Sequence, residues 1–412
     1  MYSFVIFVYL LAVKIAALFN HKARLMVKGH SEVFGILRER IDRNEKYLWF
    51  HAASLGEFEQ GRPLMEHIKK EYPQYKILLT FFSPSGYEVQ KNYKGADVIC
   101  YLPFDTPFNA RRFVKLAHPY MAFFIKYEFW QNYLKGLQKL NVPTYSISSI
   151  FRKNQVFFRW YGGTYYKVLT RFTYLFVQNE SSKELLSKLR IQNVSIIGDT
   201  RFDRVLTICH QAADLPLIES FVTAQSENSS ERKILVAGSS WAPDEDIFIR
   251  YFNEHPEIKL VMAPHVIDES HLTEICTKLK RPFLKYSEAT LENVRTIDCL
   301  IIDCFGLLSS IYRYGQVAYI GGGFGVSIHN VPEAAVYGMP VIFGPNNKKF
   351  REAQDLKNLG CGFEIQSFED CQSLLNKFFS DKDYLEEIGK KAGDYIKVNS
   401  GAVEKILRQI SL

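Results

Sequence analysis

Apolar runs of strand length that end in small or turn-forming residues recur along the chain, and they constrain its fold more than any other feature. Residues 46–203 contain the stretches KYLWFHAA, YKILLTFFSPSG, ADVICYLPFD, PYMAFFIKYEFW, VPTYSISSI, YLFVQNE and VSIIGDTRFD. Such runs are typical of strands that are buried on both faces. Because helix-compatible sequence separates them, we expect a parallel sheet with helices on both sides.

The pattern stops and then restarts, which indicates two domains. Residues 208–232 are polar and end in a Ser/Asn/Glu cluster, as expected for a linker. From residue 233 the runs KILVAGSS, IKLVMAPH, DCLIID, QVAYIGGGFG and MPVIFGP follow. We therefore expect two Rossmann-like α/β domains, 41–207 and 233–385, that face each other across a cleft and bind ligands at the carboxyl ends of their strands. Residues 386–412 are predicted to be helical.

The N-terminus is the compositional outlier. Residues 1–19 are apolar apart from Ser3 and Lys14, and the basic residues Lys22, Arg24 and Lys28 follow. This order differs from a cleaved secretory signal and favours an apolar anchor helix with a basic segment, residues 1–40, ahead of a cytoplasmic domain. The run is short for a full span. A helix that lies partly in the membrane with Lys14 snorkelling, and an ordinary buried helix, both remain open.

Charge and cysteine content narrow the classes of partner. The net charge of +7 is spread along 412 residues, so an acidic substrate or an anionic membrane surface explains it and a nucleic-acid partner is not expected. The seven cysteines include no CxxC pair. This argues against a disulfide framework and a zinc site and fits a reducing compartment.

The strongest local signal for a ligand site is YIGGGFGVSIHNVPEAAVYGMPVIFGP, residues 319–345. Its glycines at 321–323 allow the backbone to turn sharply and approach a ligand. We expect Asn330 to cap a helix whose N-terminus faces a phosphate. His329 is expected to donate to a phosphate or sugar oxygen, and Glu333 to accept hydrogen bonds from a ribose. The alternative is a structural glycine turn followed by a capped helix.

Three further turns after predicted strands offer weaker signals. Residues 238–240, Gly-Ser-Ser, can form an anion-binding nest. His265 follows the strand IKLVMAPH and is equally compatible with a structural and a binding role. Gly306 stands at a predicted helix start, where backbone N–H groups are free. The absence of G-x-x-x-x-G-K-[ST] and G-x-G-x-x-G argues against a P-loop ATPase and an ordinary dehydrogenase, and no H-E-x-x-H or G-x-S-x-G occurs either.

Two carboxylates stand out in the first half. Glu57 follows Gly56 on a small-residue turn after the first predicted strand, and Glu128 lies in IKYEFWQNY, beside Lys126 and several aromatic residues. A carboxyl group in a partly apolar setting can have a raised pKa and act as a base near neutral pH. The alternative, an exposed glutamate on a loop, is equally open for Glu128.

Five stretches, taken together, resemble the Kdo transferases of lipopolysaccharide synthesis, which move 3-deoxy-D-manno-oct-2-ulosonic acid (Kdo) from CMP-Kdo to the lipid A precursor. They are HAASLGE (51–57), KYEFW (126–130), GDTRFD (198–203), GSS (238–240) and GGGFGVSIHNVPEAAVYGMPVIFGP (321–345). The resemblance covers nearly the whole chain. The first and last motifs are specific, whereas GSS is not.

The resemblance implies a GT-B fold, with an acceptor domain, a donor domain and last helices, 386–412, that pack back on the first domain. It implies an inverting transfer without a metal or cofactor, with Glu57 as the base and Glu128 as the second catalytic carboxylate. The acceptor is then expected at Ser54, Gly56 and Lys126. The expected donor-binding residues are Arg201, Ser239, His265, Gly306, Gly322, Gly323, His329, Asn330 and Glu333. The chain departs from the family pattern at Pro264-His265, where an Arg-His pair is expected, and at Asp199-Thr200-Arg201.

The sequence therefore predicts an enzyme: a glycosyltransferase that uses CMP-Kdo and the lipid A precursor (lipid IVA) at the cytoplasmic face of the inner membrane. Two alternatives remain. One is another GT-B glycosyltransferase with a UDP-sugar donor, and the other is a non-catalytic, membrane-tethered nucleotide-binding protein.

Overall fold

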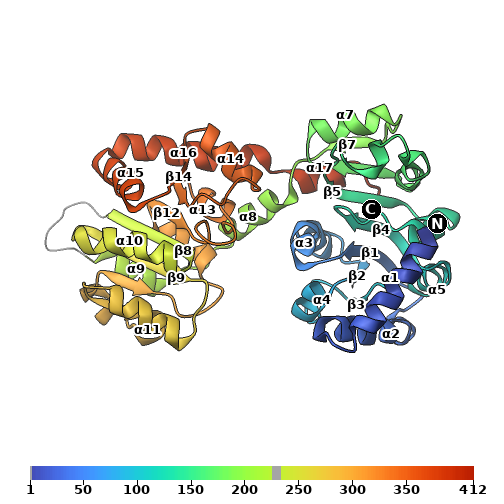
Figure 1. Ribbon diagram of the computed structural model, residues 1–412, viewed down its shortest axis with the longest axis horizontal. Helices are drawn as coiled ribbons and strands as arrows, with labels where there is room; N and C mark the ends of the chain where they lie inside the picture. The colour runs from blue at the N-terminus through green and yellow to red at the C-terminus, as the bar shows by residue number, and fades with distance from the viewer. Residues whose placement is uncertain (1, 225–232) are drawn as a thin grey trace. The chain divides into compact units, whose positions relative to one another are not determined.

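The computed structural model describes residues 2–224 and 233–412 (Figure 1). It divides into two compact units. Unit 1 consists of Met1–Arg204 together with Ser400–Leu412, and unit 2 consists of Val205–Asn399. Residues 225–232 of the expected linker lie outside the described residues.

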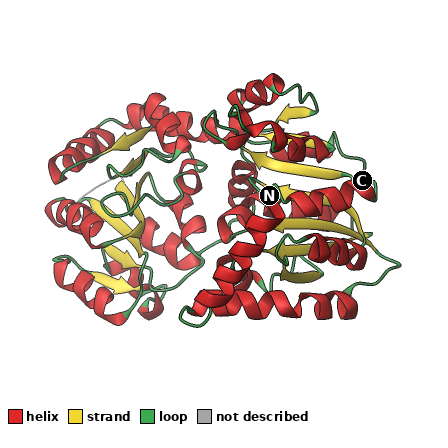
Figure 2. Cartoon of the chain, turned by 45° about the vertical axis from the view of Figure 1, so that its right-hand side comes forward, coloured by secondary structure: helices red, strands yellow, loops and turns green. Residues whose placement is uncertain are grey.

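Unit 1 is built on one sheet of seven parallel strands in the order β3-β2-β1-β4-β5-β6-β7. Helices cover both of its faces (Figure 2). The strands are β1 (Lys46–Ala52), β2 (Tyr75–Phe81), β3 (Val98–Tyr101), β4 (Pro119–Ile125), β5 (Thr144–Ser149), β6 (Tyr174–Val177) and β7 (Val194–Ile196). The helices are α1 (Tyr2–Ala16), α2 (His21–Arg40), α3 (Leu55–Glu71), α4 (Pro84–Gln90), α5 (Pro107–Ala117), α6 (Gln131–Lys139), α7 (Glu180–Lys188) and α17 (Ala402–Leu407).

The apolar runs form a core on each side of this sheet. Successive side chains of a strand point to opposite faces, so Trp49 joins one buried cluster and Phe50 joins the other. Both residues are fully buried, as are nearly all residues of β1. Double-sided burial is what the continuous apolar sequence predicted, and the parallel sheet of the first half is confirmed.

Unit 2 repeats the design with a second sheet of seven parallel strands in the order β10-β11-β9-β8-β12-β13-β14. Its strands are β8 (Lys233–Ser240), β9 (Ile258–Pro264), β10 (Phe283–Lys285), β11 (Cys299–Ile301), β12 (Val317–Ile320), β13 (Val341–Phe343) and β14 (Gly362–Glu364). Its helices are α9 (Pro216–Thr223), α10 (Ala242–Glu254), α11 (Glu269–Lys278), α12 (Leu308–Ile311), α13 (Pro332–Ala335), α14 (Arg351–Asn358), α15 (Phe368–Ser380) and α16 (Lys382–Asn399). The edge strands β10 and β14 were not predicted, because each is only three residues long and only partly buried.

The last helix, α17, belongs to unit 1. Ala402, Val403 and Ile406 are buried in the same cluster as Phe50. The carboxylate of Asp203, on α8 (Thr200–His210), accepts hydrogen bonds from the backbone N–H groups of Gly401 (3.0 Å) and Ala402 (3.1 Å). This carboxylate satisfies N–H groups that the start of a helix leaves unpaired.

The N-terminal helix α1 differs from the anchor helix that the sequence predicted. Within the described residues, no helix is both long and apolar enough to cross a membrane. The 15 residues of α1 extend about 22 Å, short of a hydrocarbon core of about 30 Å. Instead, Ile6 and Val13 of α1 pack with Met26 and Phe104, and the Tyr2 hydroxyl donates to Asp105 Oδ2 at 2.7 Å. One side of α1 therefore packs against the rest of unit 1.

Two helical glycines provide a test of the helix packing, because alanine should stabilise the protein at one position and destabilise it at the other. Gly35 of α2 is exposed, and a Cβ there would meet nothing within 4 Å, so Gly35→Ala should stabilise the protein by about 0.5–1 kcal/mol. At Gly389 of α16 a Cβ would lie 2.3 Å from the backbone oxygen of Gly338, so Gly389→Ala should destabilise by about 1–3 kcal/mol. Thermal melts of the two variants and the wild-type protein measure both effects. A stable Gly389→Ala protein would contradict the close approach of α16 to the turn at Gly338.

Candidate active site

Glu57 lies where β1 passes into α3. Ser54 is the N-cap residue of α3, and Glu57 occupies its first turn. Its Oε2 accepts a hydrogen bond from the backbone N–H of Ala53 at 2.5 Å, which folds the carboxylate back over the turn. Gly56 is exposed, and a Cβ there would meet no atom within 4 Å. The small residues of this turn therefore leave open space beside the carboxylate.

The environment of Glu57 raises its pKa to about 7. Burial is the largest cause, and the nearby charge of Glu128 is the second; the N–H of Ala53 and the charge of Lys126 oppose them. A carboxyl group with a pKa near neutral is well matched to accept a proton at physiological pH. Glu57 follows β1, and Lys126 and Glu128 follow β4; because these two strands are neighbours in the sheet, the three residues lie at the same edge, as the sequence predicted.

Glu128 follows β4 and is 8% exposed. Its Oε2 lies 3.1 Å from Nε2 of His51 and accepts a hydrogen bond from Nε1 of Trp130 at 2.5 Å. His51 is fully buried, near the end of β1, and its Nδ1 lies 2.9 Å from the Thr80 hydroxyl. Glu128 is thus part of a buried network and not an exposed loop glutamate.

Backbone conformation also marks the ends of these strands. Lys126, Ser148 and Ser239 have φ values of 59°, 56° and 53°, which place non-glycine residues in the left-handed region. The Lys126 conformation is held by two hydrogen bonds: its N–H donates to Ile147 O (2.8 Å), and its carbonyl accepts from Ser149 Oγ (2.7 Å). Strained backbone of this kind gathers at functional sites.

The position of Arg201 differs from the expectation. It belongs to unit 1, whereas the other residues expected to bind the donor belong to unit 2. Its guanidinium donates to Asp199 Oδ2 at 2.8 and 2.9 Å. The cation that was expected to meet a phosphate is therefore already paired with a carboxylate.

In unit 2, three aromatic side chains that follow β8, β9 and β12 stack on one another. The rings of Trp241 and His265 stack at 4.8 Å between centroids, and those of His265 and His329 stack at 4.5 Å. Nε1 of Trp241 donates to Nε2 of His329 at 3.2 Å, which leaves the proton of a neutral His329 ring on Nδ1. Burial and the nearby His265 lower the pKa of His329, so the ring is neutral at pH 7 and Nδ1–H is a donor.

The glycine turn after β12 requires its glycines. Gly322 has a φ of 91°, and a Cβ there would lie 2.4 Å from the oxygen of Ser327 and 3.0 Å from the His329 ring. Gly323 packs against the backbone of Gly344 at the end of β13. The buried carboxylate of Asp244 accepts hydrogen bonds from the N–H groups of Gly322 (2.8 Å) and Trp241 (3.0 Å). The turns after β8 and β12 are therefore held together by one side chain.

The expected helix cap at Asn330 is wrong. The N-cap residue of α13 is Val331, and α13 has only four residues, too few for a substantial helix dipole. Asn330 instead donates from Nδ2 to Glu333 Oε1 at 2.6 Å. Gly306 has the positive φ of 91° that its turn requires, and the following helix, α12, also has four residues.

Sequence reasoning missed the residues that connect these groups. It assigned no role to His51, Thr80, Trp130, Trp241 or Asp244. The signals were present: polar His51 and Thr80 interrupt apolar strands, and Asp244 stands three residues after the N-cap Trp241, where a capping carboxylate is expected. Their partners lie on other strands, which a single sequence does not show.

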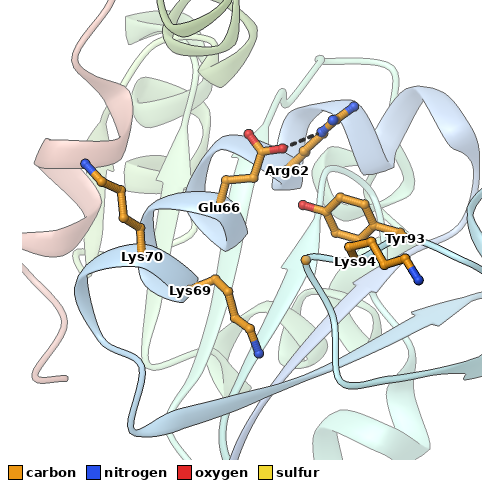
Figure 3. Close-up of a pocket in the computed structure, with 7 residues that line it drawn as sticks. Arg62, Glu66, Lys69, Lys70, Tyr93 and Lys94 are labelled. Atoms are coloured by element: carbon orange, nitrogen blue, oxygen red, sulfur yellow. Dashed lines mark hydrogen bonds and ion pairs between the residues drawn. The ribbon is translucent and has the colours of Figure 1, made fainter. Parts of the chain in front are cut away.

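A concave surface lies in each unit. The first, of about 510 Å³, lies between α3 and the loop before β3, and Figure 3 shows its lining side chains. Its cations are largely neutralised, because Lys69 pairs with Asp97 (2.7 Å), Arg62 with Glu66 (2.8 Å) and Lys70 with Glu71 (3.1 Å). The second, of about 410 Å³, lies beside the glycine turn and is lined by Val326, Ser327, Pro345, Asn346, Lys348, Lys349, Glu364 and Gln366.

The fold defines a class. Two parallel α/β sheets in two units are the architecture of GT-B-like proteins, and solved structures of that kind superpose on most of the chain. UDP-GlcNAc 2-epimerase from Neisseria meningitidis matches 88% of this chain and 100% of its own with a TM-score of 0.57 at 13% identity. MurG of Acinetobacter baumannii matches 88% and 100% with a TM-score of 0.54 at 12% identity. At such identities the similarity concerns the fold alone.

Within that class, sequence comparison shows similarity to one family. Residues 28–204 match the family model of 3-deoxy-D-manno-octulosonic-acid transferase (kdotransferase). The 3-deoxy-D-manno-octulosonic acid transferase of Aquifex aeolicus is 27% identical over 85% of this chain and 90% of its own. The Haemophilus influenzae transferase is 25% identical over 87% and 85%. Residues 28–204 thus match the Kdo transferase family model, most of the chain is similar to Kdo transferases, and the predicted enzyme class, a glycosyltransferase, is confirmed by these homologues.

The raised pKa of Glu57 predicts a pH-dependent cost to stability. A carboxyl whose pKa rises from 4.5 to about 7 on folding stabilises the fold while it is protonated; that contribution is complete below pH 4.5 and is lost as the pH rises through 7. Glu57→Gln keeps the acceptor for Ala53 N–H and cannot ionise. It should therefore raise the melting temperature at pH 8 by roughly 2–4 °C and leave it nearly unchanged at pH 4.

The matched control is Glu59→Gln on the same helix, where the glutamate side chain is 38% exposed. This variant should show no such pH-dependent gain. Equal melting temperatures for the wild-type and Glu57→Gln proteins at both pH values would contradict the raised pKa.

Proposed function

We propose that this protein transfers Kdo from CMP-Kdo to the lipid A precursor lipid IVA, with inversion at the anomeric carbon and without a metal or cofactor. The observation that carries the proposal is Glu57: a chain that matches the Kdo transferase family model over residues 28–204 holds, at its HAASLGE motif, a half-buried carboxyl group whose pKa is about 7. The homology supports Kdo transfer, and the geometry of Glu57 supports proton abstraction from an acceptor hydroxyl.

Glu57 would take the proton of the acceptor hydroxyl while that oxygen attacks C2 of Kdo. The bond from C2 to the phosphate oxygen of CMP breaks on the opposite face, and CMP leaves with the electron pair. Because one displacement occurs, the configuration at C2 inverts. Glu128 would lie beside the reacting groups, and Lys126 would keep Glu57 ionisable near pH 7. Ser54, Gly56 and Lys126 would face the acceptor.

The donor would bind to unit 2, at the carboxyl ends of β8, β9 and β12. The turn at Ser239 and the Nδ1–H of His329 would meet the phosphate charge, as preorganised dipoles do in a metal-free site, while Asp244 holds the N–H of Gly322. Lys348 and Lys349 line the adjacent pocket and would meet the carboxylate of Kdo. The remaining residues of unit 2 proposed to contact the donor are His265, Gly306, Gly323, Asn330 and Glu333.

We also propose that the enzyme acts at the cytoplasmic face of the inner membrane. The outward side of α1 supports this placement, since Phe4, Phe7 and Leu11 are 70%, 59% and 52% exposed. The basic residues Lys22, Arg24 and Lys28 follow on α2 and suit an anionic lipid surface. A phosphate-bearing lipid acceptor would be presented at the same surface.

The direct test of the function is a transfer assay with the purified full chain, CMP-Kdo and tetraacylated lipid A precursor, analysed by mass spectrometry. The wild-type protein should add the mass of Kdo to the precursor. Glu57→Ala should lower the rate about 10²–10⁴-fold because a general base is lost, while CMP binding measured by calorimetry persists. Glu59→Gln is the matched control and should transfer normally.

Three results would contradict the proposal. Turnover of a UDP-sugar in place of CMP-Kdo would favour another GT-B transferase. Nucleotide binding without turnover of any donor would favour a non-catalytic binding protein. Near-wild-type activity of Glu57→Ala would remove the proposed base.

Membrane attachment can be tested without deleting α1, whose removal would uncover Phe104 and leave Asp105 without Tyr2. The double variant Phe7→Glu/Leu11→Glu places charges on the exposed side of α1. Each apolar side chain contributes about 1.5–3 kcal/mol when buried in lipid, so flotation with anionic vesicles should show at least about 100-fold weaker binding. Val398→Glu, on α16 where the residue is 81% exposed, is the control. Unchanged binding of the double variant would place the attachment elsewhere.

A further inference from the structure

The segment that follows β5 has an unusual composition. Residues 151–172, the aromatic loop, contain eight aromatic and five basic residues and no acidic residue. The backbone of this loop forms three short 3-10 turns, η1 (Val156–Phe158), η2 (Gly162–Thr164) and η3 (Tyr166–Arg171). No residue of the loop takes part in the proposed chemistry or in the proposed donor site.

The aromatic loop is packed on the core at its start and exposed at its tip. Phe151 is buried in one of the two core clusters of unit 1, and Phe157 and Phe158 pack against that cluster. Trp160 and Tyr161, in contrast, are 94% and 56% exposed, and their rings meet edge to face at 5.5 Å between centroids. The two side chains at the tip therefore contribute little to the core.

A defined turn presents this tip to solvent. The N–H of Arg159 donates to Val156 O at 3.2 Å, and the N–H of Gly162 donates to Arg159 O at 2.8 Å. A Cβ at Gly162 would overlap the carbonyl oxygen of Val156, so the turn requires glycine directly after Tyr161. The exposure of the two aromatic side chains is thus a consequence of a hydrogen-bonded backbone.

Four basic side chains of the aromatic loop are also exposed: Arg152, Lys153, Arg159 and Lys167. None of the four forms an ion pair within residues 2–224 and 233–412, and Arg159 Nε donates only to the backbone oxygen of Asn154, at 3.3 Å. The cations of the concave surface beside α3 are, by contrast, paired with carboxylates. The positive charge of the loop is therefore uncompensated and attracts anionic surfaces.

The combination of exposed aromatic and basic side chains favours a lipid surface as the partner. Tryptophan and tyrosine rings lie at the level of the lipid headgroups, and lysine and arginine meet anionic lipids there. Single-stranded nucleic acid also binds such side chains, but it does so along a groove in which successive bases stack. A side chain that is 94% exposed, as Trp160 is, lines no groove. Charge and exposure together favour an anionic bilayer.

The aromatic loop and α1 pack on consecutive residues of one turn. Because β5 is the parallel neighbour of β4, the loop begins at the same edge of the sheet as Lys126 and Glu128. The ring of Phe129 stacks on that of Phe151 at 5.7 Å between centroids. The next residue, Trp130, packs against the cluster that α1 forms. The exposed side of α1 and the tip of the loop therefore belong to the same edge of unit 1.

We propose that the tip of the aromatic loop is a second membrane-contact site of this protein. Trp160 and Tyr161 enter the headgroup region of an anionic bilayer. Lipid phosphates bind to Arg152, Lys153 and Arg159. Two contacts on one folded unit hold it more tightly than either does alone, because the second contact forms within an already bound molecule. They also direct the carboxyl edge of the first sheet toward the bilayer; only this orientation bears on the proposed function, and the contact itself does not rest on it.

The charge test is flotation of the purified full chain with vesicles, without donor or acceptor. Arg152→Gln/Lys153→Gln should bind vesicles that contain phosphatidylglycerol about 30-fold more weakly than the wild-type protein, and should bind pure phosphatidylcholine vesicles equally well. Lys115→Gln/Lys139→Gln is the control, because it removes the same charge from exposed positions in the last turns of α5 and α6, at the opposite edge of the sheet. It should bind normally. Equal weakening by both double variants would show an effect of net charge alone and overturn the proposal.

The aromatic test uses Trp160→Ala/Tyr161→Ala in the same assay. Because both side chains are exposed, this variant should melt as the wild-type protein does, and its affinity for the anionic vesicles should fall at least about 10-fold. Leu140→Ala, which changes a side chain that is 58% exposed at the C-cap of α6, is the control and should bind normally. Unchanged vesicle binding of the aromatic variant would overturn the proposal. A change from dimer to monomer in sedimentation, with unchanged vesicle binding, would instead make the tip an interface between two copies and overturn it as well.

Quenching by brominated lipids locates the tip directly, because residues 1–19 contain no tryptophan. The emission of the wild-type protein should be quenched on binding, and most of this quenching should disappear in Trp160→Phe, which keeps an aromatic ring and should still bind. Quenching should also persist in Phe7→Glu/Leu11→Glu at lipid concentrations where that variant is bound. Equal quenching in Trp160→Phe and in the wild-type protein would place Trp160 outside the bilayer and overturn the proposal.

The kinetic experiment separates the contact site from the proposed function. In Trp160→Ala/Tyr161→Ala the KM for lipid A precursor embedded in anionic vesicles should rise about 10-fold, whereas the KM for precursor in detergent and the affinity for CMP should not change. An equal rise in detergent would give the tip a role inside the site and overturn the proposal. If the tip binds vesicles and the wild-type protein transfers no Kdo, the proposed function fails and the membrane-contact site stands.

Discussion

The pairing of β1 with β4 in unit 1 determines the arrangement of the candidate site. The two strands run parallel, and His51 lies opposite Phe124 in their register. Their carboxyl ends therefore emerge side by side, and the turn that carries Glu57 lies next to the turn that carries Lys126 and Glu128. Residues 57 and 128 are far apart in sequence, yet no long side chain or moving loop is needed to bring them together. The same rule brings the turns after β8, β9 and β12 together in unit 2.

Burying two carboxyl groups near each other costs stability, and the fold limits the cost in two different ways. Glu128 Oε2 accepts from Nε1 of Trp130 and lies 3.1 Å from Nε2 of His51, so its carboxyl group has polar partners inside the protein. Glu57 accepts from the backbone N–H of Ala53, and burial together with the nearby Glu128 raises its pKa to about 7. The two groups thus have unequal environments, as is usual when two neighbouring carboxyl groups have different roles. Replacing Glu57 by glutamine removes the destabilisation at high pH and also removes the proposed general base.

The sequence predicted the two parallel sheets because a strand buried on both faces must be apolar at every position, and such runs are visible without any partner. It placed Glu57 and Glu128 as candidates because small or aromatic neighbours mark them. It could not reveal His51, because a histidine inside an apolar strand is indistinguishable from a satisfied core residue until its partners are known. Asn330 was assigned as a cap on local propensity, but the N-cap residue of α13 is one position later, at Val331. The apolarity of residues 1–19 indicated an anchor helix that is short for a full span, whereas the packing of α1 on Phe104 is a tertiary contact that the sequence does not show.

The groups that titrate and the groups that would bind the nucleotide belong to different units. Trp49, His51, Thr80, Glu57 and Glu128 all lie in unit 1, each within one buried cluster or the turns beside it. The stack of Trp241, His265 and His329 and the turn held by Asp244 lie in unit 2. The proposed base and its neighbours thus fold within unit 1, and the proposed nucleotide contacts fold within unit 2, so substitutions can be chosen that alter one set and leave the other set folded.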